Sequence, residues 1–154
     1  MVDMHVGNYL GLVHGSEQHL VDALKKVAEH HGDEPDIEET CRLLASWSEK
    51  HLEHLGLLVQ KYGESKNLEP ANMEKALFHG PQKGSLALLR DLHDLWLLAN
   101  EVQLCWTVLE QAAQALRDDE LERVCQECGR ETKRQIAFFL TRIKQAAPQA
   151  LVVA

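Results

Sequence analysis

The sequence predicts an all-α chain folded as a four-helix bundle, in one domain over residues 1–154. Three observations favour this fold: long stretches without proline, apolar residues that repeat at helical spacing, and no strand-like alternation of apolar and polar residues. Of the 154 residues, 45% are hydrophobic and 26% are charged. This composition is typical of a globular protein and provides enough apolar side chains for the core of one domain.

The first two helices are predicted at about residues 8–31 and 37–62. The first has one apolar face and stops at Gly32, a residue that commonly ends helices. Asp36, with Glu39 three residues later, has the spacing of a capping box and predicts the start of the second. Gly63 marks the end of the second helix.

The third and fourth helices are predicted at about residues 86–117 and 120–146. Ser85 can cap the third, which is apolar around nearly its whole circumference, as expected for the centre of a bundle or a dimer face. Asp119 and Glu122 repeat the capping-box spacing after a tight turn. We expect Pro148 to end the fourth helix, because proline disrupts a helix interior.

The lengths of the connections predict the topology. The first and second helices, and likewise the third and fourth, are joined by only a few residues and must form antiparallel hairpins. Residues 63–85 separate the two hairpins and hold a possible short helix around Pro70 to Phe78. A connection of this length can run back along the whole bundle, so the sequence predicts a long crossover between the second and third helices.

Charge and hydropathy exclude several classes of partner. The formal net charge is -8 at pH 7, which disfavours binding to nucleic acid. No apolar run approaches the length of a membrane span, and the N-terminus lacks the pattern of a secretory signal, so we expect a cytoplasmic protein without a membrane partner. The cysteines lie within helical patterns of a chain that needs no disulfides, and we expect reduced thiols.

Several polar residues occupy positions where the helical repeat calls for apolar ones. Every helix contributes at least one of them: Glu17, then Ser48 and His51, then Glu101, then Glu131 and Gln135. A buried carboxylate without a partner costs several kcal/mol or takes up a proton, so these side chains require cations, protons or hydrogen bonds. A metal ion is one way to satisfy them.

Hairpin geometry predicts which of these residues lie at the same height. Glu17 and His51 are equally far along the chain from the first turn, at residue 34, and should face each other. Glu101 and Gln135 are equally far from the second turn, at residue 118, with Glu131 one helical turn nearer. The sequence therefore predicts one polar layer near the middle of the bundle, with His54 one turn away.

This pattern resembles the ferritin-like superfamily of carboxylate-bridged di-iron bundles, and most closely its small bacterial members. In that family the first and third helices each give a Glu, and the second and fourth each give a Glu-x-x-His motif. The resemblance covers about residues 8–146 and implies that Glu17, Glu101, His51 and Glu131 are metal ligands.

The chain departs from the family pattern at two ligand positions. Ser48 stands where the second helix of the family has Glu, and Arg134 stands where the fourth has His. The resemblance therefore implies iron or manganese at an altered site, with His54 nearby, and oxygen or peroxide redox chemistry if the protein is an enzyme.

Two readings without metal remain open. In one, His51 or Arg134 acts as a cation within an internal network that fixes helix register. The protein is then a helical interaction or regulatory module, expected to be a homodimer. In the other, Cys125-x-x-Cys128 carries thiol redox chemistry, although in a helix this spacing more simply places two small apolar side chains on neighbouring turns.

Overall fold

The computed structural model describes residues 5–63, 77–80 and 83–152 of the chain. It contains the helices α1 (Val6–His30), α2 (Pro35–Tyr62), α4 (Ser85–Leu116) and α5 (Asp119–Leu151). No strand occurs within these ranges, which confirms the predicted all-α class and the number of long helices. The predicted short helix in the crossover lies mostly outside the described residues.

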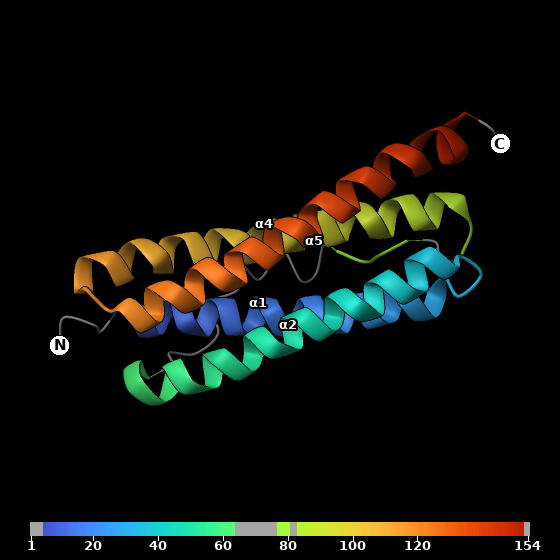
Figure 1. Cartoon of the computed structure of the whole chain (residues 1–154). Helices are drawn as coiled ribbons and strands as arrows, with labels where there is room; N and C mark the ends of the chain where they lie inside the picture. Colours follow the sequence, from blue (N-terminus) through green and yellow to red (C-terminus); the bar gives the residue numbers. More distant parts are fainter. Residues whose placement is uncertain (1–4, 64–76, 81–82, 153–154) are drawn as a thin grey trace.

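The four helices form two antiparallel hairpins that lie against each other (Figure 1). α1 pairs with α2, and α4 with α5, while α1 also packs on α4 and α2 approaches α5. Figure 1 shows α2 and α4 running in the same direction along the bundle. Each helix is therefore antiparallel to both of its neighbours.

The short described segment between the hairpins lies against α1 and α4. Leu77 is buried in the core, and the backbone N–H of Phe78 donates a hydrogen bond to Asp94 Oδ2 at 2.7 Å. The ring of Phe78 meets that of His19 edge-on, with centroids 5.9 Å apart. This segment therefore crosses the face formed by the first and third long helices.

The helix starts differ slightly from the predicted ones. α2 begins at Pro35, and its N-cap is Glu34 rather than Asp36. Proline suits this position because its fixed φ matches the helix and its missing N–H would have no partner there. The cap of α5 is Asp118 rather than Asp119, and its carboxylate accepts a hydrogen bond from the Leu121 N–H at 3.1 Å.

The prediction that Pro148 ends the fourth helix is wrong. α5 continues through Pro148 to Leu151, and the Val152 N–H bonds to the Pro148 carbonyl at 3.0 Å. Because proline lies within the last turn, it disturbs only the end of the helix. The predicted cap of the third long helix also differs by one residue. Ser85 is the first residue of α4, and Gly84 occupies the cap position.

The core is built from leucine and other apolar side chains of all four helices. Trp106 and Phe139 are its largest fully buried members. No helix in the described part of the chain is both long and apolar enough to cross a membrane. His31, the C-cap residue of α1, is buried, with its Nε2 2.8 Å from Asp91 Oδ2 on α4.

Candidate functional site

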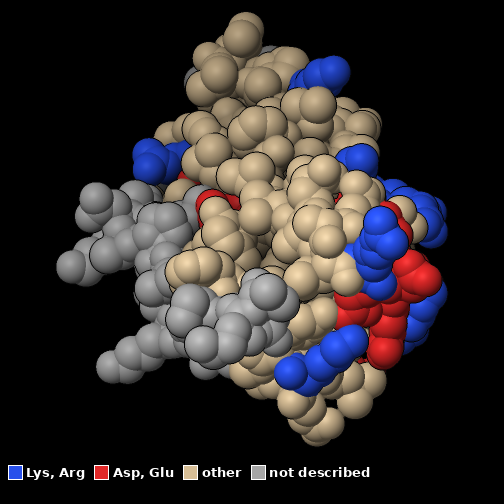
Figure 2. Space-filling model, turned by 90° about the vertical axis from the view of Figure 1, so that its left-hand side faces the viewer, with Lys and Arg blue, Asp and Glu red and all other residues tan. Residues whose placement is uncertain are grey.

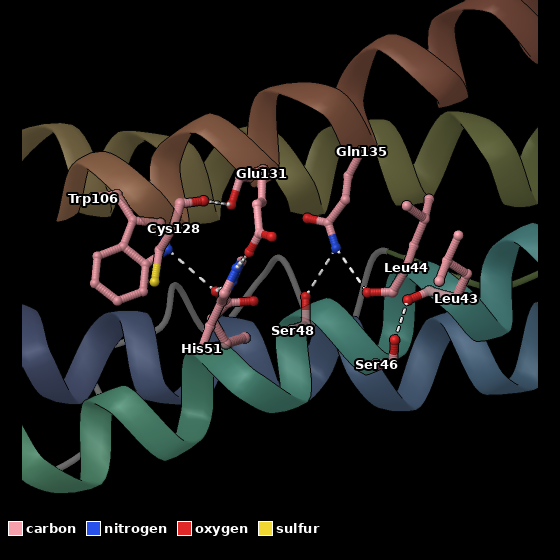
Figure 3. Close-up of polar contacts among 11 residues, drawn as sticks. Leu43, Leu44, Ser46, Ser48, His51, Trp106, Cys128, Glu131 and Gln135 are labelled. Atoms are coloured by element: carbon pink, nitrogen blue, oxygen red, sulfur yellow. Dashed lines mark hydrogen bonds and ion pairs between the residues drawn. The ribbon is translucent and has the colours of Figure 1, made fainter. Parts of the chain in front are cut away.

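The centre of the bundle holds an imidazole between two carboxylates. His51, in the middle of α2, lies with its Nδ1 2.5 Å from Glu17 Oε2 on α1. Its Nε2 lies 2.8 Å from Glu131 Oε1 on α5. Figure 3 shows Glu131 reaching from α5 toward His51. These three residues, here called the triad, join three helices, and the predicted facing of Glu17 and His51 is confirmed.

The fourth helix enters this site through a tryptophan. Trp106 on α4 donates its indole N–H to Glu17 Oε2 at 3.1 Å, and its ring meets that of His51 edge-on. Trp106 was not among the predicted site residues, although a buried indole N–H commonly finds an acceptor. The position of Trp106 on its own helix did not reveal which acceptor it meets, because that depends on how α4 is placed along α1.

The triad favours the cationic form of His51. Burial lowers the pKa of His51, but the hydrogen bonds and charges of Glu17 and Glu131 outweigh burial and raise that pKa above its ordinary value of 6.5. An imidazolium carries a proton on each nitrogen and can donate to both carboxylates at once, which a neutral imidazole cannot. With His51 protonated, the site is a buried cation that bridges two carboxylates.

Exposure changes steeply along the triad. The side chains of Glu17 and His51 are 0% and 1% exposed, whereas that of Glu131 is 41% exposed. Outside Glu131 lies a surface hollow of about 300 Å³ between α2 and α5, lined also by Lys50, His54, Glu127, Cys128 and Arg130. The triad is therefore a hydrogen-bonded path from solvent to a carboxylate in the core.

A second polar contact lies one turn further along the same helices. The side-chain amide of Gln135 on α5 donates to Ser48 Oγ and to the Leu44 carbonyl, both at 3.0 Å (Figure 3). Ser48 stands at the position where the ferritin-like pattern has a ligand, and here it serves as a hydrogen-bond acceptor. Neighbouring turns of α2 and α5 are thus joined by polar side chains.

One residue of the predicted layer, Glu101, lies away from the triad. Glu101 is half-buried on α4, where its Oε1 lies 3.6 Å from Cys105 Sγ, and it makes no hydrogen bond to the triad. Distances from a turn fix heights only within one hairpin, so they did not determine which α4 residue meets Glu17, and that residue is Trp106 rather than Glu101. His54 lines the hollow beside Glu131.

Arg134 does not approach the carboxylates of the core. It is exposed, and its guanidinium carbon lies 5.3 Å from the centre of the Trp47 ring on α2. This contact is a cation–π interaction across the surface between α2 and α5. Of the two cations considered from the sequence, His51 is the one that meets the buried carboxylates.

The donor atoms do not fit a two-iron centre. Glu17 Oε1 is buried and receives no hydrogen bond from the described residues, so it has capacity for one more partner. Both nitrogens of His51, however, already face carboxylates, and Glu101 lies on another level. Within the described ranges no group of three or more His, Cys, Asp or Glu side chains is placed to hold a metal ion.

The cysteines are buried free thiols. Burial raises the pKa of both Cys41 and Cys125 to about 12, and it raises the pKa of Cys128 further. A thiol is reactive and binds metal mainly as the thiolate. The environment of Cys125 and Cys128 therefore favours a packing role over thiol redox chemistry.

Comparisons of the chain with family models, with curated proteins and with solved structures find no match. The triad and the surfaces around it are therefore the features that indicate a function.

Proposed function

We propose that this chain is a metal-free helical interaction or regulatory module of ferritin-like topology. In it, protonated His51 takes the place that a metal ion has in the di-iron bundles. The observation that carries the proposal is that both nitrogens of His51 face carboxylates, one from α1 and one from α5. An imidazolium satisfies these buried charges as a bound cation would.

The directions of the helices support the ferritin-like part of the proposal. α2 and α4 are consecutive long helices that run the same way (Figure 1). Consecutive parallel helices need a connection that returns along the bundle, which is the long crossover of that topology.

In this module the triad is a positioning device. Glu17, His51 and Glu131 come from three different helices, so their hydrogen bonds are made together only in one relative placement of α1, α2 and α5. Buried charged groups of this kind can fix helix register at some cost in stability. The proposed role of the site is therefore to hold one arrangement of the outer surfaces.

The outer face of α4 is the surface that we propose meets a second copy of the chain. Leu86 and Leu104 are 45% and 58% exposed, and half-buried Leu97 lies between them. Their spacing of eleven and seven residues places all three on one side of the helix. Such an apolar line along an outer helix is typical of helix-to-helix contact.

Metal analysis of protein purified without a chelating tag tests the metal-free claim. We expect less than about a tenth of an equivalent of bound metal, and no rise in melting temperature with Fe(II), Mn(II) or Zn(II). A stoichiometric metal whose stabilising effect disappears in Glu131→Gln, but persists in Glu127→Gln, would contradict the proposal. Both variants remove one carboxylate from α5, and only the first removes one from the triad.

Sedimentation equilibrium of the same sample tests the interaction surface. We expect a dimer for the wild-type chain, a monomer for Leu104→Glu and a dimer for the control Leu57→Glu, whose side chain on α2 is 61% exposed. A wild-type chain that stays monomeric, or equal dimerisation by both variants, would refute the α4 surface.

A further inference from the structure

The contact between α2 and α5, here called the seam, has polar contacts from one end to the other. It begins with Arg142 Nε, 2.9 Å from Asp36 Oδ2, and ends with Lys61 Nζ, 2.7 Å from Asp118 Oδ2. The contacts between these ends run from Trp47 with Arg134, through Ser48 with Gln135, to His51 with Glu131. Residue numbers rise on α2 as they fall on α5, so the seam is antiparallel.

The other helix contacts are more extensive. Of the helix pairs in contact, α2 and α5 approach each other least closely, whereas α5 packs mainly on α4, and α1 packs on α2 and α4. Figure 2 shows the end of the bundle where α4 turns into α5, with acidic and basic side chains gathered together on one edge. Extensive packing therefore holds each hairpin and the α1–α4 contact, while α2 and α5 share the core with less close packing and with a series of polar contacts between them.

His51 is the buried titratable member of the seam, and it can satisfy both carboxylates only as a cation. When it loses a proton, one ring nitrogen becomes an acceptor that faces a carboxylate oxygen. Glu17 is fully buried and is also held by Trp106, whereas Glu131 is 41% exposed. The remaining proton therefore stays on Nδ1 with Glu17, and Glu131 is the partner that leaves for solvent.

We propose that the seam is a latch that opens when His51 is deprotonated, separating α2 from α5 at Glu131 while the two hairpins remain packed through α1 and α4. The proposal rests on the proposed function, because a metal ion on His51 would take the place of the proton. It adds a regulating signal, a rise in pH, to the module.

The groups that face His51 from each neighbouring helix agree with this direction. α1 presents Glu17, α5 presents Glu131 with Cys128 beside it, and α4 presents the neutral indole of Trp106. On α2 itself, Lys50 and His54 line the hollow outside Glu131. Both carboxylates favour the protonated imidazole, so the closed seam is the protonated form.

The sign of the pH effect follows from the raised pKa of His51. A group whose pKa in the folded protein lies above its ordinary value of 6.5 contributes its full stabilisation below that value. That contribution is lost as the pH rises through the folded-state pKa. The latch is therefore closed in mildly acidic solution and opens on the alkaline side.

Cys128 provides a native reporter of the opening. Its thiol is buried and lines the hollow between α2 and α5, whereas Cys125, on the same helix, lines a separate hollow between α4 and α5. The full chain is alkylated at about pH 6 and at about pH 9 in the presence of EDTA. Peptide mass spectrometry then gives the alkylation rate of each thiol in the folded protein. Dividing by the rate in unfolded protein at the same pH corrects for thiol ionisation.

We expect the protection of Cys128 to fall with rising pH by about tenfold for each unit by which the pKa of His51 is raised, while Cys125 stays protected. Glu131→Gln should remove this pH dependence. A carboxamide can accept from the protonated nitrogen or donate to the deprotonated one, so it suits both forms of His51. The control Glu127→Gln, one turn away, should behave as wild type.

Unchanged protection of Cys128 in wild type, while NMR shows His51 titrating, would overturn the latch. Equal loss of protection in wild type and Glu131→Gln would do the same. His51→Gln is a second variant with the same expected outcome as Glu131→Gln, since it has no titratable ring. Failure of the proposed function is seen separately, as a stoichiometric metal, whereas a metal-free protein with pH-independent protection refutes the latch alone.

Discussion

Replacing His51 by leucine tests the triad most directly, because it removes the cation and leaves its buried partner. Glu17 is 0% exposed, its Oε1 has no hydrogen bond from the described residues, and its Oε2 would retain only Trp106. Breaking a buried ion pair in this way costs about 3 to 5 kcal/mol of unfolding free energy. For a chain of this length that loss lowers the melting temperature by about 6 to 20 °C.

The charge left on Glu17 is the stated cause of this loss, so a second substitution should relieve it. Glu17→Gln keeps an oxygen for Trp106 and removes the charge. We expect the double variant Glu17→Gln/His51→Leu to recover about half or more of the stability lost by His51→Leu alone. Leucine is close in size to histidine, which limits the contribution of a cavity to the measured difference.

Urea unfolding followed by circular dichroism at neutral pH, in EDTA, measures both quantities. An unchanged dependence on urea would show that the variants unfold from comparably compact states. A loss below about 1 kcal/mol for His51→Leu, or a double variant less stable than His51→Leu, would refute the assignment of His51 as the buried cation.

Two further predictions concern neighbouring contacts. Trp106→Phe removes an N–H that donates to the buried Glu17 carboxylate and should cost about 1.5 to 3 kcal/mol of unfolding free energy. The control Trp96→Phe removes a buried N–H that has no acceptor among the described residues. Thermal unfolding should therefore show a clearly smaller loss of stability for the control. Burial raises the pKa of Asp118, but hydrogen bonds from Lys61, Tyr62 and the Leu121 N–H outweigh it and hold that pKa at about 2. Its stabilisation is therefore present above the ordinary value of 3.8 and is lost as the pH falls toward about 2. Acid unfolding should show Asp118→Ala destabilised by about 1 to 2 kcal/mol at neutral pH and much less at the acid end; an equal difference at both pH values would contradict this role.

The sequence by itself determined the helices and the pairing within each hairpin. Helical periodicity predicted all four long helices, and short connections predicted that Glu17 would face His51, which the 2.5 Å contact confirms. Both signals are local, because a helix repeats its own pattern and a short turn fixes the register of the two helices it joins. The predicted helix starts were off by one or two residues, since Pro35 begins α2 and Asp118 caps α5.

Only the tertiary structure decided how the two hairpins lie against each other. The relative placement of the hairpins put Trp106, rather than Glu101, beside Glu17, and brought Glu131 to His51 while leaving Arg134 on the surface. The physical reason is that side chains distant in the sequence set this placement by packing together. Moving one hairpin by one helical turn leaves the apolar periodicity of every helix unchanged, so periodicity cannot predict the placement. The sequence therefore indicated that Glu17, Ser48, His51 and Gln135 are buried, and the packing of the helices determined their partners.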